Sequence, residues 1–350
     1  MNDSLYNRYQ QAKQQSSLQS IAELANYLNV TEAELIYACA NADDAKRLNV
    51  NTTLLLPELT NLGEIKAITA NKYATHIHIG EFKNVRLNNQ TGIVLNPREL
   101  DLRIFLDHWA ISFALTETSS DNLQHSIQFF DYHGNAVHKI YATEKTNMAV
   151  WYKLINQYQM TTNPPLNLRP ATVHPQSPQI TQTVKKQLET DWRNMTNVHQ
   201  FFQLLQKYNV KRQQIFAAVS DELAYQVDNH ALYQILHSAF NQQNEIMIFV
   251  GSLGCMQIFT GCIQKLAAYH DKLSALQKIN VLNPKFSLNV IETGIANSWV
   301  TRKPTKDGIV TSLEIFDHHG DPIIQLFGQR TEGEPEQLDW RKQISTLTKI

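Results

Sequence analysis

The chain has 350 residues and sets 31 lysines and arginines against 32 aspartates and glutamates, so its formal net charge is −1. At roughly 100–200 residues per domain, this length predicts about two domains, each able to bury a core. The charge balance leaves no excess of cations for phosphates, so we expect neither nucleic acid nor an anionic membrane as a partner. No apolar run approaches the ~18–20 residues that span a bilayer, and the first residues lack a secretory-signal pattern, so we expect no membrane insertion. The three cysteines, Cys39, Cys255 and Cys262, show neither disulfide-framework nor zinc-site spacing, which favours the cytoplasm.

The first half of the chain predicts helices, then strands, then a closing helix. Residues 19–41 carry apolar side chains at the i, i+3 and i+4 spacing of amphipathic helices. Residues 63–96 alternate and end at Gly or Asn turn signals, which predicts strands. Residues 100–106 place Arg103 inside an otherwise apolar run, which we predict to be helical. Residues 110–142 predict a meander with a His-Gly-Asn turn between two strands.

Proline marks the middle of the chain. Five of the eleven prolines fall within 15 residues, namely Pro164, Pro165, Pro170, Pro175 and Pro178. Proline lacks a backbone donor and fixes φ, so this stretch predicts an extended connection. We therefore expect an N-terminal repeat at 1–160, a Pro-rich linker at 161–190 and a C-terminal repeat at 191–350.

The second half repeats the order of the first. Residues 196–240 have helical spacing, 244–283 alternate, and 297–328 predict a meander with a His-Gly-Asp turn. Gly251–Gly254 is expected to be a hairpin turn.

Short segments of the two halves also match in sequence. Leu28-Asn29-Val30 recurs as Tyr208-Asn209-Val210 at an offset of 180, and residues 126–134 recur as 312–320 at an offset of 186. Offsets this similar are hard to obtain by chance. Strands in short-linked runs favour antiparallel pairing, and the helices are segregated from them. The sequence therefore predicts an α+β fold made by tandem duplication, each half a large antiparallel sheet with helices.

The common catalytic signatures are absent from the sequence. It has no phosphate-binding glycine loop, GxSxG elbow, HExxH motif or dinucleotide fingerprint. This disfavours kinases, dehydrogenases and serine hydrolases, and it directs attention to the thirteen histidines.

His199 stands out among the histidines. It follows Thr196-Asn197-Val198, and Thr196 is a good N-cap candidate, which would place His199 in the first turn of a helix. The positive end of a helix disfavours an imidazolium, and a neutral imidazole is what a metal ligand needs. The neighbouring Phe201 and Phe202 suit a flat hydrophobic ligand. On these grounds alone His199 is either a ligand or a core or capping histidine.

Other polar residues allow two interpretations. His76 and His78 alternate on one strand and would share a face, as an exposed or core pair or as a second ligand site. Arg103 could form an ion pair with Asp101 or Asp107. Cations near 302–303 and 330 lie beside predicted strand ends, where they are either solvated or able to hold a carboxylate-bearing ligand.

Several motifs together resemble one family. They are Met195-Thr196-Asn197-Val198-His199-Gln200-Phe201-Phe202, Glu245–Gly251, Gln257–Gly261, Trp299–Thr305 and Gly328–Glu334 in the second half, with Val94–Pro97 and Leu100–Arg103 in the first. The chain resembles, over nearly its whole length and in the same order of motifs, the cytoplasmic haemin-degrading and haemin-transport proteins of the HemS/ChuS (HmuS) type.

The resemblance implies haem b as ligand and substrate, held in a cleft between parts of both repeats. His199 matches the axial ligand of the haem iron, and Arg103 matches an arginine on the opposite face of the haem, with a catalytic role. The remaining matched positions line the pocket and hold propionates or distal waters: Arg212, Lys303, Gln325, Phe327 and Arg330. Phe327 departs from the family pattern, because many relatives have a tyrosine there and this side chain has no hydroxyl.

The function implied by the resemblance is oxidative degradation of haem in iron acquisition. Oxygen or peroxide would open the macrocycle and release iron, and electrons would come from an external donor, since no flavin or nicotinamide site is visible. The alternative is a haem carrier or storage protein that takes haem from an ABC importer and delivers it to a separate haem oxygenase. A third reading is a structural duplicate without a ligand.

Overall fold

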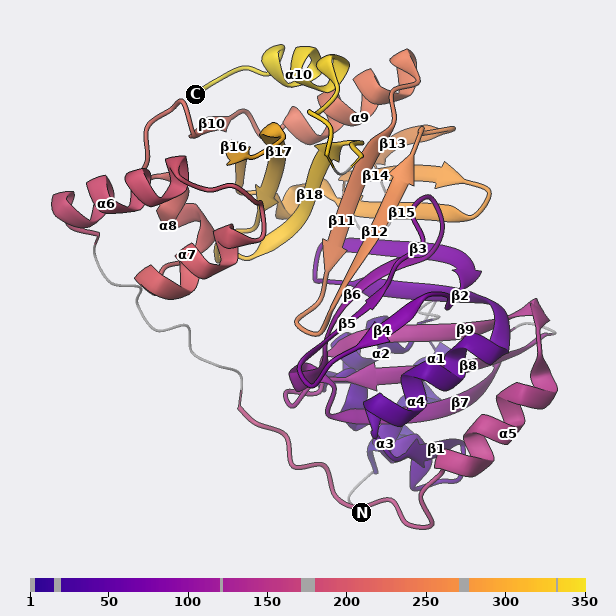
Figure 1. The fold of residues 1–350 in the computed structure, drawn as a ribbon. Coiled ribbons are helices and arrows are strands. Elements are labelled where there is room, and N and C mark those ends of the chain that lie inside the picture. Colours follow the sequence, from indigo (N-terminus) through magenta and orange to yellow (C-terminus); the bar gives the residue numbers. More distant parts are fainter. Residues whose placement is uncertain (1–3, 16–19, 120–121, 171–179, 271–276, 332) are drawn as a thin grey trace. The chain divides into compact units, whose positions relative to one another are not determined.

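The structure, a computed structural model, describes residues 4–15, 20–119, 122–170, 180–270, 277–331 and 333–350 (Figure 1). The chain divides into two compact units. The first unit comprises Met1–Ala70, Ile77–Thr172 and Ser252–Gln257, and the second comprises Asn71–His76, Val173–Gly251 and Ile258–Ile350. Each half of the sequence therefore gives one short segment to the other unit, and the two segments, 71–76 and 252–257, are equivalent at an offset of 181.

The first half follows the predicted order of helices, strands and closing helix. Its elements are α1 (Leu5–Gln15), α2 (Ile21–Leu28), α3 (Glu32–Ala40), β1 (Ala45–Leu48), α4 (Thr52–Glu58), η1 (Leu59–Leu62), β2 (Gly63–Ala70), β3 (Ala74–Glu81), β4 (Val85–Leu87), β5 (Thr91–Val94), β6 (Asp101–Phe105), η2 (Leu106–His108), β7 (Ile111–Ser119), β8 (Asn122–Phe130), β9 (Ala136–Thr146) and α5 (Met148–Tyr158).

The second half has a closely similar order. Its elements are α6 (Gln182–Arg193), α7 (Gln200–Tyr208), α8 (Arg212–Phe216), β10 (Ala224–Val227), α9 (Ala231–Gln242), β11 (Ile246–Gly251), β12 (Cys255–Gly261), β13 (Leu266–His270), β14 (Gln277–Asn283), β15 (Phe286–Ile291), η3 (Glu292–Gly294), β16 (Asn297–Thr305), β17 (Gly308–Phe316), β18 (Pro322–Gly328) and α10 (Leu338–Ser345). Among the described residues, no helix is long and apolar enough to cross a membrane.

The strands belong to two nine-stranded antiparallel sheets, which confirms the predicted α+β class. In the first unit β1, β7, β8, β9 and β2 are neighbours in that order, and in the second unit β10, β16, β17, β18 and β11 repeat the order. The β-strand register repeats as well, since Gln128 pairs with Lys139 and Glu314 pairs with Gln325, both at an offset of 186. The two units are therefore structural copies, as tandem duplication predicts.

The repeated Asn-Val motif has a backbone reason. Asn29 caps the end of α2 with φ of 55°, and Asn209 caps the end of α7 with φ of 50°. Asparagine tolerates this left-handed conformation better than most residues, so it ends both helices in the same way. The motif is therefore a C-cap in both units.

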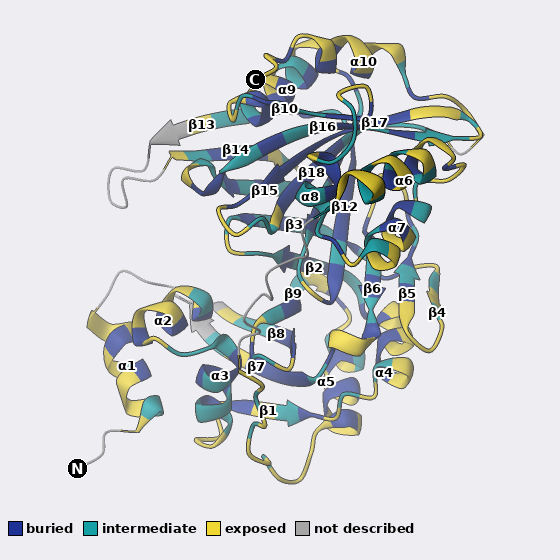
Figure 2. Cartoon of the chain, turned by 90° about the vertical axis from the view of Figure 1, so that its left-hand side faces the viewer, coloured by how far each residue is buried: buried dark blue, intermediate teal, exposed yellow. Residues whose placement is uncertain are grey.

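Helices cover both faces of the sheet strands in the second unit. Figure 1 shows α6, α7 and α8 on one side of β16–β18 and α9 and α10 on the other. Leu188, Trp192, Phe201 and Phe216 belong to one buried cluster, whereas α9 and α10 bury Leu236 and Trp340 in a separate cluster. Figure 2 shows the helices exposed on their outer faces and buried toward the strands, as their amphipathic spacing requires.

Three details differ from the predictions. Residues 100–106 are not helical, because β6 occupies Asp101–Phe105, and Leu100, Leu102, Ile104 and Leu106 alternate into the core. The buried residues thus recur every two positions, as in a strand, rather than every 3.6 positions, as in a helix. The range 196–240 also contains the strand β10, and β1 was not predicted. These are four-residue strands, too short for periodicity to detect.

The middle of the chain is partly described. Pro164, Pro165 and Pro170 lie in a stretch without helix or strand, and 171–179, with Pro175 and Pro178, lies outside the described residues. Helix α6 begins at Gln182, so the end of the range 161–190 is helical. The predicted hairpin turn at Gly251–Gly254 is confirmed between β11 and β12, where the Ser252 amide donates to the Cys255 carbonyl at 2.8 Å.

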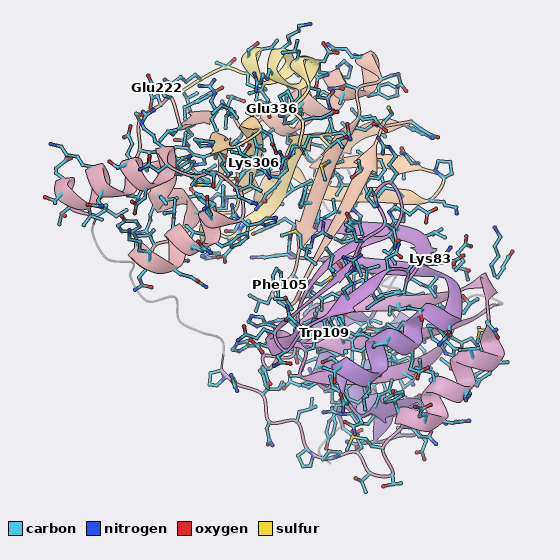
Figure 3. The ribbon with its side chains drawn as sticks, in the orientation of Figure 1. Lys83, Phe105, Trp109, Glu222, Lys306 and Glu336 are labelled. Carbon is cyan, nitrogen blue, oxygen red and sulfur yellow. The ribbon has the colours of Figure 1, made fainter. Side chains whose placement is uncertain are left out.

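The segment 252–257 is closely packed in the first unit. The indole N–H of Trp109, labelled in Figure 3, donates to the Gly254 carbonyl at 2.8 Å, and Cys255 is fully buried. A Cβ atom on Gly254 would lie 2.6 Å from Cγ1 of Val137, a stiff side chain. There is therefore no room for a side chain at this position.

We expect Gly254→Ala to lower the free energy of unfolding by about 1–3 kcal/mol, the usual cost of overpacking a core. Chemical denaturation monitored by circular dichroism measures this change. The control is Leu253→Ala, in the same turn, because Leu253 is 56% exposed and its truncation leaves the core intact. Equal effects of the two substitutions would contradict tight packing at Gly254.

We expect His138 to make the first unit sensitive to acid. Its ring is buried beside Trp109 and Phe82, and its Nδ1 lies 2.9 Å from the Thr69 hydroxyl. Burial lowers the pKa of His138 to about 3. The unfolded chain therefore takes up a proton at this residue below about pH 6.5, and the folded chain does so only near pH 3.

Between pH 6.5 and 3, we expect the free energy of unfolding to fall more steeply with falling pH in the wild type than in His138→Gln. The difference between the two slopes is up to about 1.4 kcal/mol per pH unit. Denaturation series across this range, compared between the two proteins, measure the difference. His318→Gln, at an exposed turn, is the control. A His138→Gln slope equal to that of the wild type would show that this histidine does not cause the acid sensitivity.

Candidate functional site

His199 lies at the start of helix α7 in the second unit. It is the N-cap residue, exposed, and its backbone amide donates to Oδ1 of Asn197 at 2.9 Å. The side-chain oxygen of Gln200 accepts hydrogen bonds from the amides of Thr196 and Asn197, at 2.7 and 3.1 Å. These bonds fix the backbone that carries the imidazole, which itself projects from a helix N-terminus.

The predicted N-cap at Thr196 is wrong. The helix begins four residues later, at Gln200, and Asn197 rather than Thr196 supplies the side-chain acceptor. Thr196 instead connects this segment to the end of β16. Its carbonyl accepts a hydrogen bond from the amide of Lys306, labelled in Figure 3, at 3.0 Å. Asparagine and threonine are both good acceptors near helix starts, so the sequence alone does not decide between them.

An apolar and cationic surface adjoins His199. Phe202 is three residues further along the helix and therefore on the same face, and it is 51% exposed. The guanidinium of Arg212 lies 5.2 Å from the ring centres of both Phe201 and Phe202. Exposed aromatic surface, a cation and an imidazole thus occur together at the start of α7 and α8.

A group of polar side chains, which we call the polar stripe, follows one face of the sheet behind these helices. Its members are Thr301 and Lys303 on β16, Ser312 and Glu314 on β17, and Gln325 on β18. Residues directly opposite one another in a β-ladder share a face, and Thr301 pairs with Ser312 while Glu314 pairs with Gln325. Every member is buried.

Glu314 is the centre of the polar stripe. One of its oxygens lies 2.7 Å from Nζ of Lys303, and the other lies 2.8 Å from Nη1 of Arg212. Burial would raise the pKa of Glu314, but Lys303 and Arg212 outweigh burial and lower it to about 2. Burial lowers the pKa of Lys303, and the charge of Glu314 opposes that change. Glu314 therefore stays ionised with two cations beside it.

Phe327 and Arg330 extend the same region. Phe327 pairs with Ser312 across the ladder, and its ring lies 5.0 Å from that of Phe249. Its contact there is apolar, as its side chain has no hydroxyl. Arg330 follows the end of β18 and is partly exposed.

Arg103 belongs to the first unit. It lies on β6, and its Nη1 forms the ion pair with Asp101 that the sequence allowed; it also donates to the Leu102 carbonyl at 3.1 Å. Burial raises the pKa of Asp101, and Arg103 acts against this. The other predicted site residues, His199, Arg212, Lys303, Gln325, Phe327 and Arg330, all lie in the second unit.

His76 and His78 are both buried on the inward face of β3. The ring of His76 packs against Phe286 at 4.8 Å. The two side chains therefore share a face as predicted, and that face is part of the core.

Sequence reasoning missed the rest of the polar stripe. Glu314, Thr301 and Ser312 were not singled out, although Glu314 is a charged residue between the buried Leu313 and Ile315 of a strand. A charge at an inward position of a strand buried on both faces was the available signal, because such a residue needs partners.

Comparison with known proteins places the chain in a family. The family model described as the haemin-degrading HemS/ChuX domain matches residues 29–158 and 209–347. The hemin transport protein HmuS of Yersinia pestis is 50% identical over 351 residues, which cover 99% of this chain and 98% of that protein.

Solved structures agree in fold over nearly the whole chain. The haem-degrading enzyme ChuS of Escherichia coli O157:H7 is 45% identical with a TM-score of 0.91, covering 98% of both chains. The haem-bound form of PhuS, a haem-binding protein from Pseudomonas aeruginosa, is 34% identical with a TM-score of 0.93, covering 99% of both chains. The family model matches one long segment in each half of the chain and more than half of the chain in total, so this chain belongs to the HemS/ChuX family of haemin-degrading proteins.

Proposed function

We propose that this protein binds haem in its second unit, with His199 as the axial ligand of the iron, and degrades it oxidatively to release iron in the cytoplasm. The observation that carries the proposal is the group at the start of α7: an exposed imidazole, an exposed phenylalanine one turn away and an arginine stacked on that phenylalanine. These are the three chemistries that haem requires, namely a nitrogen for iron, an apolar surface for the macrocycle and a cation for its carboxylates.

The residues of the second unit divide these tasks. His199 binds iron through a ring nitrogen, and the Asn197 and Gln200 side chains hold its backbone in place. Phe202 covers part of the macrocycle, while Arg212 and Arg330 bind carboxylates. Gln325 and Phe327 lie behind them on the sheet, where Phe327 offers bulk and no hydrogen bond.

Degradation needs groups that the second unit does not supply. Haem brings the redox-active iron, and the electrons come from an external donor. Arg103, matched by resemblance to an arginine on the other face of haem, is the proposed catalytic residue, because its guanidinium can stabilise negative charge as it develops. Before haem binds, the ion pair with Asp101 holds the Arg103 side chain in place.

A carrier function is the second candidate, because the two structurally compared relatives carry different names. ChuS is named a haem-degrading enzyme, and PhuS is named a haem-binding protein. A carrier would receive haem from a haem importer and pass it to a separate oxygenase, using the same site.

We expect His199→Ala to lose the sharp Soret band that haemin titration produces with the wild type, and to weaken haem binding at least tenfold, because coordination by the imidazole is lost. The control is His230→Ala. His230 is also an exposed helix N-cap, and its amide bonds to Asp228 at 2.8 Å as that of His199 bonds to Asn197. A Soret band that is the same in His199→Ala and the wild type would remove His199 as the ligand.

We expect the wild-type haem complex, given a reductant and oxygen with catalase present, to lose its Soret band and yield an open-chain tetrapyrrole and free iron. Absorbance, product mass and an iron chelator measure the three changes. Arg103→Met should bind haem and degrade it at least tenfold more slowly, because one charge-stabilising donor is removed. A Soret band that survives the reductant would instead support the carrier.

A further inference from the structure

The hydrogen bonds of Lys303 are all made inside the protein. Its ammonium has three donors, and they bond to Oγ1 of Thr301 at 2.5 Å, Oγ of Ser312 at 3.1 Å and Oε1 of Glu314 at 2.7 Å. Its side chain is only 5% exposed. Lys303 therefore has no donor left for a ligand in this arrangement.

Arg212 is in a different position. Among the described residues it makes one side-chain hydrogen bond, from Nη1 to Oε2 of Glu314 at 2.8 Å, and a guanidinium has five donors. Its side chain is 16% exposed and stacks against the exposed Phe202. Arg212 is thus held on one side by Glu314 and keeps donors for a ligand on the other.

We propose that Glu314, itself held by Lys303, is a positioning residue of the haem site, which aims Arg212 at a haem carboxylate. This inference rests on the proposed function.

The charges of the cluster fit this arrangement. Arg212 and Lys303 are cations and Glu314 is an anion, so the cluster carries one surplus positive charge in a buried place, which an incoming carboxylate would neutralise. Burial lowers the pKa of Lys303, while the adjacent Glu314 favours its charged form, and Ser312 and Thr301 accept its remaining hydrogen bonds. The stripe thus orients Arg212 before any ligand arrives.

The first unit lacks this cluster at the equivalent positions. At the offset of 186, Lys303 corresponds to Glu117, Glu314 to Gln128 and Gln325 to Lys139. Lys139 forms an ion pair with Glu32, so the first unit has a different set of charges at these positions. The fold itself does not require the Lys303–Glu314–Arg212 cluster, which points to a role in ligand binding.

The test compares haemin with haemin dimethyl ester, whose carboxylates are blocked, by titration of the full-length protein. The variants are Glu314→Gln, Arg212→Met and the double variant. We expect the wild type to prefer haemin, and Glu314→Gln to lower this preference about tenfold, the typical effect of losing a charged hydrogen bond. Arg212→Met should lower it at least as much, and the double variant no further, because both changes act on one contact.

The matched control is Glu336→Gln. Glu336, labelled in Figure 3, is another buried glutamate of the second unit, bonded to Thr311 and paired with Arg341 at 2.9 Å. It should change the melting temperature and leave the preference for haemin unaltered. The positioning role is measured as the ratio of the affinities for haemin and for its dimethyl ester. A general loss of stability lowers both affinities together and leaves this ratio unchanged.

Several outcomes overturn the inference and leave the proposed function intact. In one, the wild type binds haemin and Glu314→Gln keeps its full preference over the ester. In another, the effects of Glu314→Gln and Arg212→Met simply add. A wild type that does not bind haemin would overturn the proposed function.

Discussion

The buried carboxylate of Glu314 is the constraint on which the candidate site depends. An ionised carboxylate within a sheet is costly unless every lone pair has a partner, and here Lys303, Ser312 and Arg212 provide them. Removing any one of these groups would leave part of the buried carboxylate without a hydrogen-bond partner. These bonds therefore fix helix α8 relative to strands β16 and β17. The exposed Phe202 of α7 contacts Arg212 of α8 and so depends on this arrangement.

Duplication explains how such a cluster could arise on an existing fold. The cross-strand register of β16–β18 is that of β7–β9, so both units offer the same inward positions next to the same kind of helices. The first unit places Glu117, Gln128 and Lys139 at positions where the second has Lys303, Glu314 and Gln325. Because register depends on the alternation of apolar residues, these side chains could change without disturbing the pairing.

Local patterns predicted the fold well and the site only in part. Helical spacing at 19–41 and the hairpin at Gly251–Gly254 are confirmed, since each depends on neighbours in the sequence. The strand at 101–105 was mistaken for a helix because a short apolar run fits both periods. Glu314 went unnoticed because its partners, Lys303 and Arg212, are brought to it by strand pairing and helix packing, which no local pattern contains.

Local geometry alone does not make His199 a ligand. His230 has the same helix-start backbone and the same Asx hydrogen bond to its amide, but its Nδ1 lies 3.6 Å from the carboxylate of Glu292, so its ring already has a partner. Among the described residues, the ring of His199 makes no hydrogen bond, and exposed aromatic surface and a positioned arginine adjoin it. The surroundings, not the cap, thus distinguish the two histidines. Since the polar stripe fixes that arginine, the chemistry at the helix start follows from packing deep in the sheet.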